Sequence, residues 1–283
     1  MTTMQTHSLA RGDEAPRYIA VANQKGGVGK TTTVLNLGAA LARRGLRVLV
    51  VDLDLQANLT HCLTEPLPEG AANVCEVLLD ELPISDIIVN TSTDDLYLAP
   101  AGESMANLEI NLASTIGREQ ALRNAFSHPV MRDFDYVLMD NPPYLSLVTI
   151  NSLVAASDVL VPVSCEYLPM LGLKWLLSTV RKVQARLHPS LQVLGYVLTM
   201  YDRRESITGD VEEILREQFG PQVFETIIRI NTRHKSAPSE RMTIFEYERS
   251  RRGRGTEDYT NLAEELLRRL GRNGTEADAS SAW

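Results

Sequence analysis

The chain has 283 residues, of which 44% are hydrophobic and 23% are charged, and its formal net charge at pH 7 is −8. This composition is typical of a globular protein with its own core, and the acidic balance argues against global attraction to nucleic acid or anionic lipid. The three cysteines are widely spaced without a C-x-x-C pair, so neither a disulfide framework nor a zinc site is indicated. No stretch resembles a secretory signal or has the length of a membrane span, which predicts a cytoplasmic protein.

Apolar runs typical of strands alternate with helical patterns along most of the chain. The predicted strands are residues 18–23, 47–52, 96–99, 136–140, 159–163, 193–198 and 223–228. Helical patterns follow residue 30 and cover residues 108–126, 171–187, 210–219 and 257–270. This alternation predicts an α/β fold, in which a single domain over residues 17–270 holds a mostly parallel, twisted β-sheet with helices on both faces. Residues 1–16 are expected to form a flexible N-terminal tail, and residues 271–283 a disordered C-terminal tail.

A glycine-rich stretch lies between the first predicted strand and the first predicted helix. Glycines let backbone N–H groups approach phosphate oxygens, and a helix N-terminus favours an anion. Lys30 can reach the outer phosphates, while the hydroxyl of Thr31 can bind Mg²⁺. The predicted nucleotide-binding residues of this stretch are Lys25, Gly26, Gly27, Val28, Gly29, Lys30, Thr31 and Thr32.

The second lysine, Lys25, gives this stretch the deviant Walker A pattern, and here the sequence resembles the ParA/MinD superfamily of P-loop ATPases. The general P-loop pattern has glycine where this chain has Gln24. The resemblance covers about residues 17–270 and implies a P-loop NTPase fold, ATP and Mg²⁺ as cofactors, and weak intrinsic ATPase activity. In this family the signature lysine reaches the partner's nucleotide in an ATP-dependent sandwich dimer, which implies the same for Lys25. An exposed lysine without a role is the alternative.

Acidic residues stand where two of the predicted strands end. In open α/β sheets, ligands bind at the carboxyl ends of the strands. Asp140 ends an apolar run as in a Walker B motif, and the predicted Mg²⁺ site consists of Thr31, Asp52 and Asp140. The next residue is Asn141 rather than a glutamate, so the carboxylate that positions the attacking water must come from elsewhere.

The run from Asp52 to Gln56 resembles the switch I segment of ParA proteins, in which the second aspartate serves hydrolysis. The resemblance assigns this role to Asp54 and predicts Lys25, Lys30 and Asp54 as the catalytic residues. A simple cap of the following segment is the alternative for Asp54. Leu55 stands where the family usually has proline, and Asn141 where it usually has a small residue, which predicts an altered loop stiffness or rate.

Segments further along the chain resemble ParA rather than MinD. They cover residues 142–156, 161–167, 197–202 and 230–239. The last of them matches the family pattern Asn-x-Arg-x-x-x-Ala-Pro. From this match, Asn231 and Pro238 are predicted to lie on the adenine side of the nucleotide.

A basic run spans residues 229–254, where eight Arg or Lys residues stand against three Glu, a local charge of +5. A compact positive surface can hold the DNA backbone without reading bases, although such runs are often only solvated. Arg233 of this run, and Arg204 before it, match family positions that contact nonspecific DNA. The predicted DNA-binding residues are Arg204, Arg233, Lys235, Arg251 and Arg252.

Together these features predict a ParA-type DNA-partitioning ATPase associated with the nucleoid. Its ATP-bound homodimer would bind double-stranded DNA nonspecifically, and hydrolysis stimulated by a ParB-like centromere-binding protein would release it. The alternatives are a ParA-like ATPase that positions a protein cargo, a MinD-like membrane-associated ATPase, and a nucleotide-gated scaffold without turnover. No membrane partner is expected, because residues 266–270 are too short for an amphipathic membrane helix. A nitrogenase-type iron protein is not expected, because the cysteines lack the paired contexts of a cluster.

Overall fold

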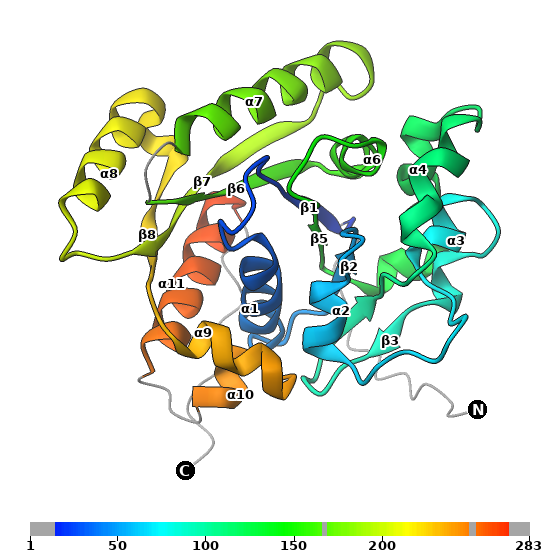
Figure 1. The fold of residues 1–283 in the computed structure, drawn as a ribbon, viewed down its shortest axis with the longest axis horizontal. Coiled ribbons are helices and arrows are strands. Elements are labelled where there is room, and N and C mark those ends of the chain that lie inside the picture. Colours follow the sequence, from blue (N-terminus) through cyan, green and yellow to red (C-terminus); the bar gives the residue numbers. More distant parts are fainter. Residues whose placement is uncertain (1–14, 166–168, 249–252, 272–283) are drawn as a thin grey trace.

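A computed structural model describes residues 15–165, 169–248 and 253–271, which build an eight-stranded sheet with helices on both faces (Figure 1). The strand order is β3-β4-β2-β5-β1-β6-β7-β8, and all neighbours are parallel except β3 and β4. The predicted α/β class with a mostly parallel sheet is thereby confirmed. The strands are β1 Arg17–Val21, β2 Val48–Asp52, β3 Val89–Asn90, β4 Leu96–Ala99, β5 Tyr136–Asp140, β6 Asp158–Ser164, β7 Gln192–Tyr201 and β8 Val223–Arg229.

The sheet is covered on both faces because its strands are apolar on both sides. Ile19 and Val21 of β1 pack into one core layer, whereas Ala20 between them packs into the other. All residues of β2 are buried, as expected for an inner strand of a parallel sheet. One layer lies under α1, α2, α10 and α11, and the other lies under α3 to α8.

The helices differ widely in length. The longer ones are α1 Lys30–Ala42, α4 Met105–Ala113, α6 Leu147–Ala155, α7 Pro169–Arg186, α8 Ser206–Phe219 and α11 Arg254–Arg269. The shorter ones are α2 Asn58–Leu63, α3 Val74–Leu78, α5 Ala121–Ala125, α9 Arg233–Ser236 and α10 Ile244–Glu248. Short 3₁₀ segments are Ile84–Asp86, Arg118–Gln120, Pro129–Asp133, Gly220–Gln222 and Ala237–Glu240.

The prediction of one helix over residues 108–126 is wrong. Helix α4 ends at Ala113, and the chain turns at Gly117, whose φ of 70° cannot continue a right-handed helix. A 3₁₀ segment and α5 follow this turn. The two-residue edge strand β3 was also not predicted, since it is too short to show a periodic pattern. The other predicted elements are present, with ends that shift by a few residues.

The edge strand β8 is protected by carboxylates from α11. Glu265 accepts hydrogen bonds from the backbone N–H groups of Glu225 and Thr226, at 2.9 and 2.8 Å. Asp258 accepts one from the N–H of Arg229 at 2.9 Å. An open edge strand is a template for unwanted pairing, so these side chains end the sheet while they anchor α11 to it.

Gly195 in β7 offers a test of this packing. The pairing register of β6 with β7 shifts here, and a Cβ added at Gly195 would lie 2.4 Å from the backbone O of Gln222. We therefore expect Gly195→Ala to lower the free energy of unfolding by about 3 kcal/mol, measured by urea denaturation.

Gly209→Ala is the matched control, because it lies within α8 and its added Cβ would meet nothing within 4 Å. This substitution should raise the free energy of unfolding by about 0.5–1 kcal/mol, because alanine is a better helix former than glycine. Equal effects of the two substitutions would contradict the close contact between β7 and the segment before β8.

Candidate nucleotide site

The glycine-rich loop connects β1 to α1, and hydrogen bonds tie it to two neighbouring strands. The N–H of Lys25 donates to Oδ1 of Asn23 at 3.1 Å, and Asn23 Nδ2 donates to the O of Pro162 at 2.8 Å. At the other end, Oγ1 of Thr199 donates to the O of Val28 at 2.9 Å. The loop is therefore tied to the ends of β6 and β7 in the absence of any ligand.

The backbone of the loop depends on glycine at two positions. Gly27 and Gly29 have φ angles of 73° and 81°, which other residues rarely adopt. Gly29 is the N-cap of α1, so the first turn of this helix presents unpaired N–H groups toward the loop. The structure thus brings the predicted residues from Gly26 to Thr32 into one phosphate cradle.

Lys30 is buried in the first turn of α1, and its Nζ donates to the O of Lys25 at 3.1 Å. Burial lowers the pKa of Lys30, and the nearby charges of Asp140 and Asp54 oppose this change. A phosphate bound in the cradle would take over the contact that the Lys25 carbonyl now makes. The contact of Lys30 with phosphate stays a prediction.

Lys25 contacts its own chain in this structure. Its Nζ donates to Oγ of Ser164, the last residue of β6, at 3.3 Å. A Cβ added at Gly172 of α7 would lie 3.5 Å from the Lys25 Cβ, so α7 packs closely on this lysine. The reach of Lys25 to a partner's nucleotide stays a prediction. Ser164 was not singled out from the sequence, although its place at the end of a strand is a signal.

The predicted metal residues Asp52 and Asp140 end the adjacent strands β2 and β5, where they are register partners. Both are fully buried. Asp52 is well bonded: one of its oxygens accepts from Thr60 N and Oγ1 at 2.8 and 2.7 Å, and the other from Asp54 N at 3.2 Å. Thr60 was not predicted as a site residue, because nothing in its local sequence points to Asp52.

Asp140 differs from Asp52, since neither carboxylate oxygen has a hydrogen-bond partner among the described residues. Burial raises the pKa of Asp140 well above its ordinary value, the charge of Asp52 adds to this, and Thr31 and Lys30 oppose it. Burial likewise raises the pKa of Asp52 to about 6. Buried carboxylates without a counter-ion are costly, and oxygen donors of this kind suit Mg²⁺. Asp140 and Thr31 therefore fit the predicted metal site, with Asp52 beside them.

Asp54 lies just beyond the end of β2 and is 7% exposed. Its Oδ1 accepts from Gln56 N at 3.0 Å, and Ala57 follows in a left-handed conformation with φ 51°. This side chain stands next to the buried carboxylates and close enough to Lys30 to affect its pKa. Asn141, by contrast, bonds to the backbone of two strands: its Nδ2 donates to the O of Val21 and the O of Met139, both at 3.2 Å.

The predicted adenine-side residues follow β8, three strands from β1 in the sheet order. Asn231 donates from Nδ2 to Oε1 of Glu248 at 3.1 Å, and its Oδ1 accepts from Arg233 N at 3.0 Å. Pro238 lies in the 3₁₀ segment that follows α9. Their contact with a nucleotide stays a prediction.

Arg204, Arg233 and Lys235, three of the predicted DNA-binding residues, lie at the same end of the sheet. The side chains of Arg204 and Arg233 are 86% and 53% exposed, and Lys235 on α9 is exposed too. Arg251 and Arg252 lie outside the described residues. A cavity of about 440 Å³ opens beyond the ends of β7 and β8, and its lining residues are Tyr201, Asp202, Arg203, Arg204, Arg229, Ile230 and Arg254.

Ion pairs reduce the positive charge that the sequence suggests for this region. Arg229 binds Asp258 and Glu257 of α11, which raise its pKa, and Arg241 pairs with Glu65. Arg204 pairs with Asp202, and its guanidinium lowers the pKa of that carboxyl group to about 2. Arg203 and Arg254, by contrast, form no ion pair among the described residues. The local charge of +5 therefore overstates the free positive charge of this surface.

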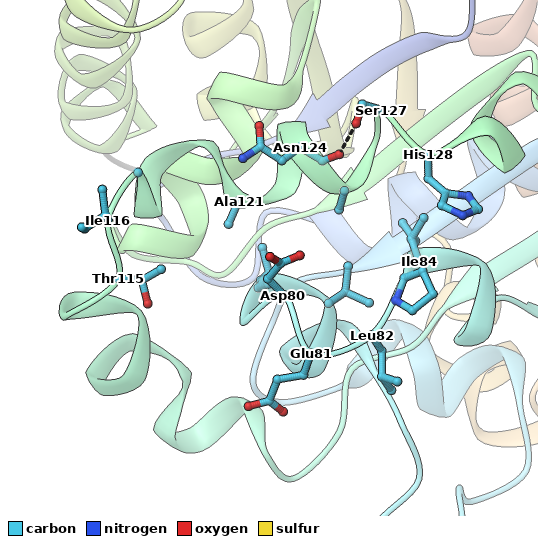
Figure 2. A pocket seen from close by; sticks show the side chains of 15 residues that line it. Asp80, Glu81, Leu82, Ile84, Thr115, Ile116, Ala121, Asn124, Ser127 and His128 are labelled. Carbon is cyan, nitrogen blue, oxygen red and sulfur yellow. Dashed lines mark hydrogen bonds between the residues drawn. The ribbon is translucent and has the colours of Figure 1, made fainter.

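A second cavity, of about 490 Å³, lies between α3, the segment after it, and α5 (Figure 2). Asp80, Glu81, Asn124 and His128 are among the polar side chains around it. None of the predicted nucleotide, metal or DNA-binding residues lines this cavity. It has no part in the site described above.

Comparison with known proteins gives relatives that span nearly the whole chain. A family model described as an AAA domain matches residues 16–193. The sporulation initiation inhibitor protein Soj of Bacillus subtilis is 43% identical over 250 residues, which cover 88% of this chain and 98% of that protein. The chromosome partitioning protein ParA of Caulobacter vibrioides is 39% identical over 254 residues, covering 89% of this chain and 94% of that protein.

Two solved structures are similar to this fold over most of their length. Cobyrinic acid a,c-diamide synthase of Mycobacterium smegmatis, with bound ADP and magnesium, has a TM-score of 0.79 and 37% identity, covering 90% of this chain and 96% of that one. The cell division ATPase MinD of Pyrococcus furiosus has a TM-score of 0.68 and 26% identity, covering 89% of this chain and 98% of that one.

Neither carboxylate oxygen of Asp140 has a hydrogen-bond partner among the described residues, so replacing Asp140 should have opposite effects on stability without and with ligand. Without Mg²⁺ or nucleotide, Asp140→Asn should stabilise the fold by about 1–2 kcal/mol, because it removes a buried carboxylate whose charge Lys30 offsets only in part. Thermal unfolding in EDTA should then show a Tm rise of roughly 2–6 °C. With Mg²⁺ and ATP, the same variant should lose most of the stabilisation that the ligand gives to the wild type.

Asp94→Asn serves as the control, since Asp94 is an exposed aspartate outside the site. It should change neither measurement. A variant Asp140→Asn that melts below the wild type in EDTA would show that the charged carboxylate is satisfied without a cation.

Proposed function

This chain belongs to the ParA/Soj family of P-loop ATPases, and on that premise we propose that it partitions DNA through a nucleotide-controlled hold on the DNA backbone. The chain is an ATPase with ATP and Mg²⁺ as its cofactors. Its relative ParA, a chromosome partitioning protein, supports partitioning as the process that this activity serves. The observation that carries the proposal is that one sheet places two groups suited to phosphate at the same edge, a glycine-rich loop after β1 and an arginine-lined cavity after β7 and β8.

The chemical step is phosphoryl transfer from ATP to water. Lys30 and the N–H groups of the first turn of α1 would hold the phosphates, and Asp54 would orient the attacking water. Asp140 and Thr31 would hold Mg²⁺, which offsets the charge on the phosphoryl oxygens. Asn141 is bonded to two backbone carbonyls, so the water-orienting role falls to Asp54.

The control of DNA binding would come from dimerisation. In an ATP-bound sandwich dimer, Lys25 would turn from Ser164 toward the partner's nucleotide. The basic surfaces of two protomers would then face the same DNA. Affinity for DNA rises steeply with the number of phosphates contacted, so joining two such surfaces converts weak into stable binding. Hydrolysis would separate the protomers, and a ParB-like partner would accelerate this step.

A membrane-bound role has less support, because helix α11 uses its apolar face in the core. Leu262 and Leu266 are fully buried against the sheet. In the described part of the chain, no helix has the length and hydropathy needed to cross a bilayer.

The similarity to cobyrinic acid a,c-diamide synthase raises a second candidate, an ATP-dependent amidation. Release of ammonia from glutamine by a cysteine needs a reactive thiolate. Cys62, Cys75 and Cys165 are all buried, and burial raises the pKa of each thiol, to about 11 for Cys62 and about 12 for Cys165. The cysteines of this chain therefore do not favour that reaction.

The proposed function is tested by the binding of a labelled random-sequence DNA duplex, followed by fluorescence anisotropy with ADP and with ATP at two salt concentrations. We expect salt-sensitive binding that is much tighter with ATP. Arg233→Glu should weaken it and reduce the slope of log affinity against log salt by about 1 per lost phosphate contact, while ATP affinity is kept.

Arg123→Glu is the matched control, because it makes the same charge change at an exposed position of α5, outside the segments that carry the predicted DNA-binding residues. It should leave DNA affinity close to that of the wild type. Equal losses from both substitutions, or wild-type binding that ignores the nucleotide, would contradict the proposed switch.

Asp54→Ala separates binding from turnover. Among the described residues, Asp54 affects the phosphate cradle only through its charge. Its removal should therefore keep ATP binding, dimerisation and DNA binding. The hydrolysis rate should fall at least 100-fold, which is within the usual range for a group that positions water or acts as a base. Phosphate release and DNA dissociation are measured in parallel. A hydrolysis rate like that of the wild type would move the water-orienting role to another group.

A further inference from the structure

Glu248, the last residue of α10, is a buried carboxylate that joins three segments of the chain. Its side chain is 0% exposed. One oxygen, Oε2, accepts from the backbone N–H of Thr256 at 2.8 Å, at the start of α11. The other, Oε1, accepts from Asn231 Nδ2 at 3.1 Å and lies 3.5 Å from a guanidinium nitrogen of Arg233. One oxygen atom thus faces a predicted adenine-side residue and a predicted DNA-binding residue at once.

The surrounding backbone keeps this carboxylate in place. A Cβ added at Gly253 would lie 1.9 Å from Oε2 of Glu248, so only glycine lets the chain pass so close. Oε1 also accepts from the N–H of Gly255 at 3.3 Å. Glu248 is therefore fixed by α11, whereas its contact with Arg233 is long and leaves room to tighten.

Helix α10 is in turn attached to the helix that follows the phosphate cradle. Oδ1 of Asn36 in α1 accepts from the N–H of Ile244, the first residue of α10, at 2.8 Å. Nδ2 of Asn36 donates to the O of Thr32 at 2.9 Å. Helices α10 and α11 both pack against α1, and α9 packs against α10 (Figure 1). As the last residue of α10, Glu248 therefore links the helix that follows the glycine-rich loop to the segment of Asn231 and Arg233.

We propose that Glu248 is a positioning residue that couples the adenine side of the nucleotide site to the DNA-binding surface, through Asn231 and Arg233. The inference rests on the proposed function, since it assigns a residue to the nucleotide control of DNA binding. A nucleotide that engages the Asn231 amide removes a donor from Oε1. Among the described residues, Oε1 then keeps the N–H of Gly255 at 3.3 Å, and because a buried carboxylate gains from a further charged donor, Glu248 tightens its long contact with Arg233. Arg233 is then held in one orientation, which lowers the entropy cost of its contact with a DNA phosphate.

The test measures the ratio of DNA affinities with ATP and with ADP, both at saturating concentration, for the full chain. In Glu248→Gln the ratio should fall about 5- to 10-fold, at the lower end of usual coupling between sites. Dimer formation with ATP, followed by sedimentation velocity, should be unchanged. Because coupling is reciprocal, DNA should also tighten ATP binding by a correspondingly smaller factor in the variant.

Glu246→Gln is the matched control on the same helix. Glu246 accepts from N and Oγ1 of Thr243 at 2.7 and 2.9 Å and from Oγ of Ser92 at 2.9 Å, and among the described residues it bonds to neither Asn231 nor Arg233. Glu246→Gln removes the same negative charge from the same helix, so a general electrostatic increase in DNA affinity would appear in both variants. The ratio in Glu246→Gln should equal that of the wild type.

A purely structural role would lower DNA affinity equally with ATP and ADP, or abolish the dimer, and either result overturns the proposal. If Glu248→Gln does not fold, Asn231→Asp tests the same link, because an aspartate keeps the acceptor for Arg233 N–H but cannot donate to Glu248. An unchanged ratio in that variant overturns the inference alone. A wild type without nucleotide-dependent DNA binding overturns the proposed function, and the inference with it.

Discussion

The site depends on a pair of buried carboxylates that the sheet forces together. Asp52 and Asp140 end adjacent parallel strands in the same register, so both carboxylates lie together in a buried site beside Lys30. Asp52 is satisfied by Thr60 and the backbone, but Asp140 is not satisfied by any described residue. The protein thus carries an electrostatic cost that a cation and a phosphate group can remove. Ligand binding and local stability are therefore linked.

The parallel sheet also explains why the glycine-rich loop and the arginine-lined cavity lie on one side of the molecule. Carboxyl ends of parallel strands all point to one edge, where the connecting loops carry function. The ends of β1, β2 and β5 hold the nucleotide residues, and the ends of β7 and β8 hold the arginines. Helices α1, α10 and α11 pack together beneath both groups. Because they form one core layer, a shift in the position of one of them is felt by the others.

Much of the fold and of the nucleotide site could be predicted because local rules agree with one another. The apolar runs of β2 and β5 and the glycine positions before α1 specify strand, turn and helix without reference to distant residues. The failures have a common cause, which is dependence on distant partners. Thr60, Ser164 and Glu248 are ordinary residues in their local sequence, and only the tertiary fold brings them to Asp52, Lys25 and Asn231. The charge of the basic run was misjudged for the same reason, since the partners of Arg229 lie in α11.

The central claim is that Mg²⁺ and ATP together neutralise the buried carboxylates and lysine that the fold assembles. The most direct measurement is calorimetric titration of the wild-type chain with ATP, once with Mg²⁺ and once with EDTA, alongside thermal unfolding in both conditions. The account predicts tight binding and a clear rise in Tm only when Mg²⁺ is present. Equal affinity and equal stabilisation with EDTA would contradict it, because Asp140 would then have no need of a cation.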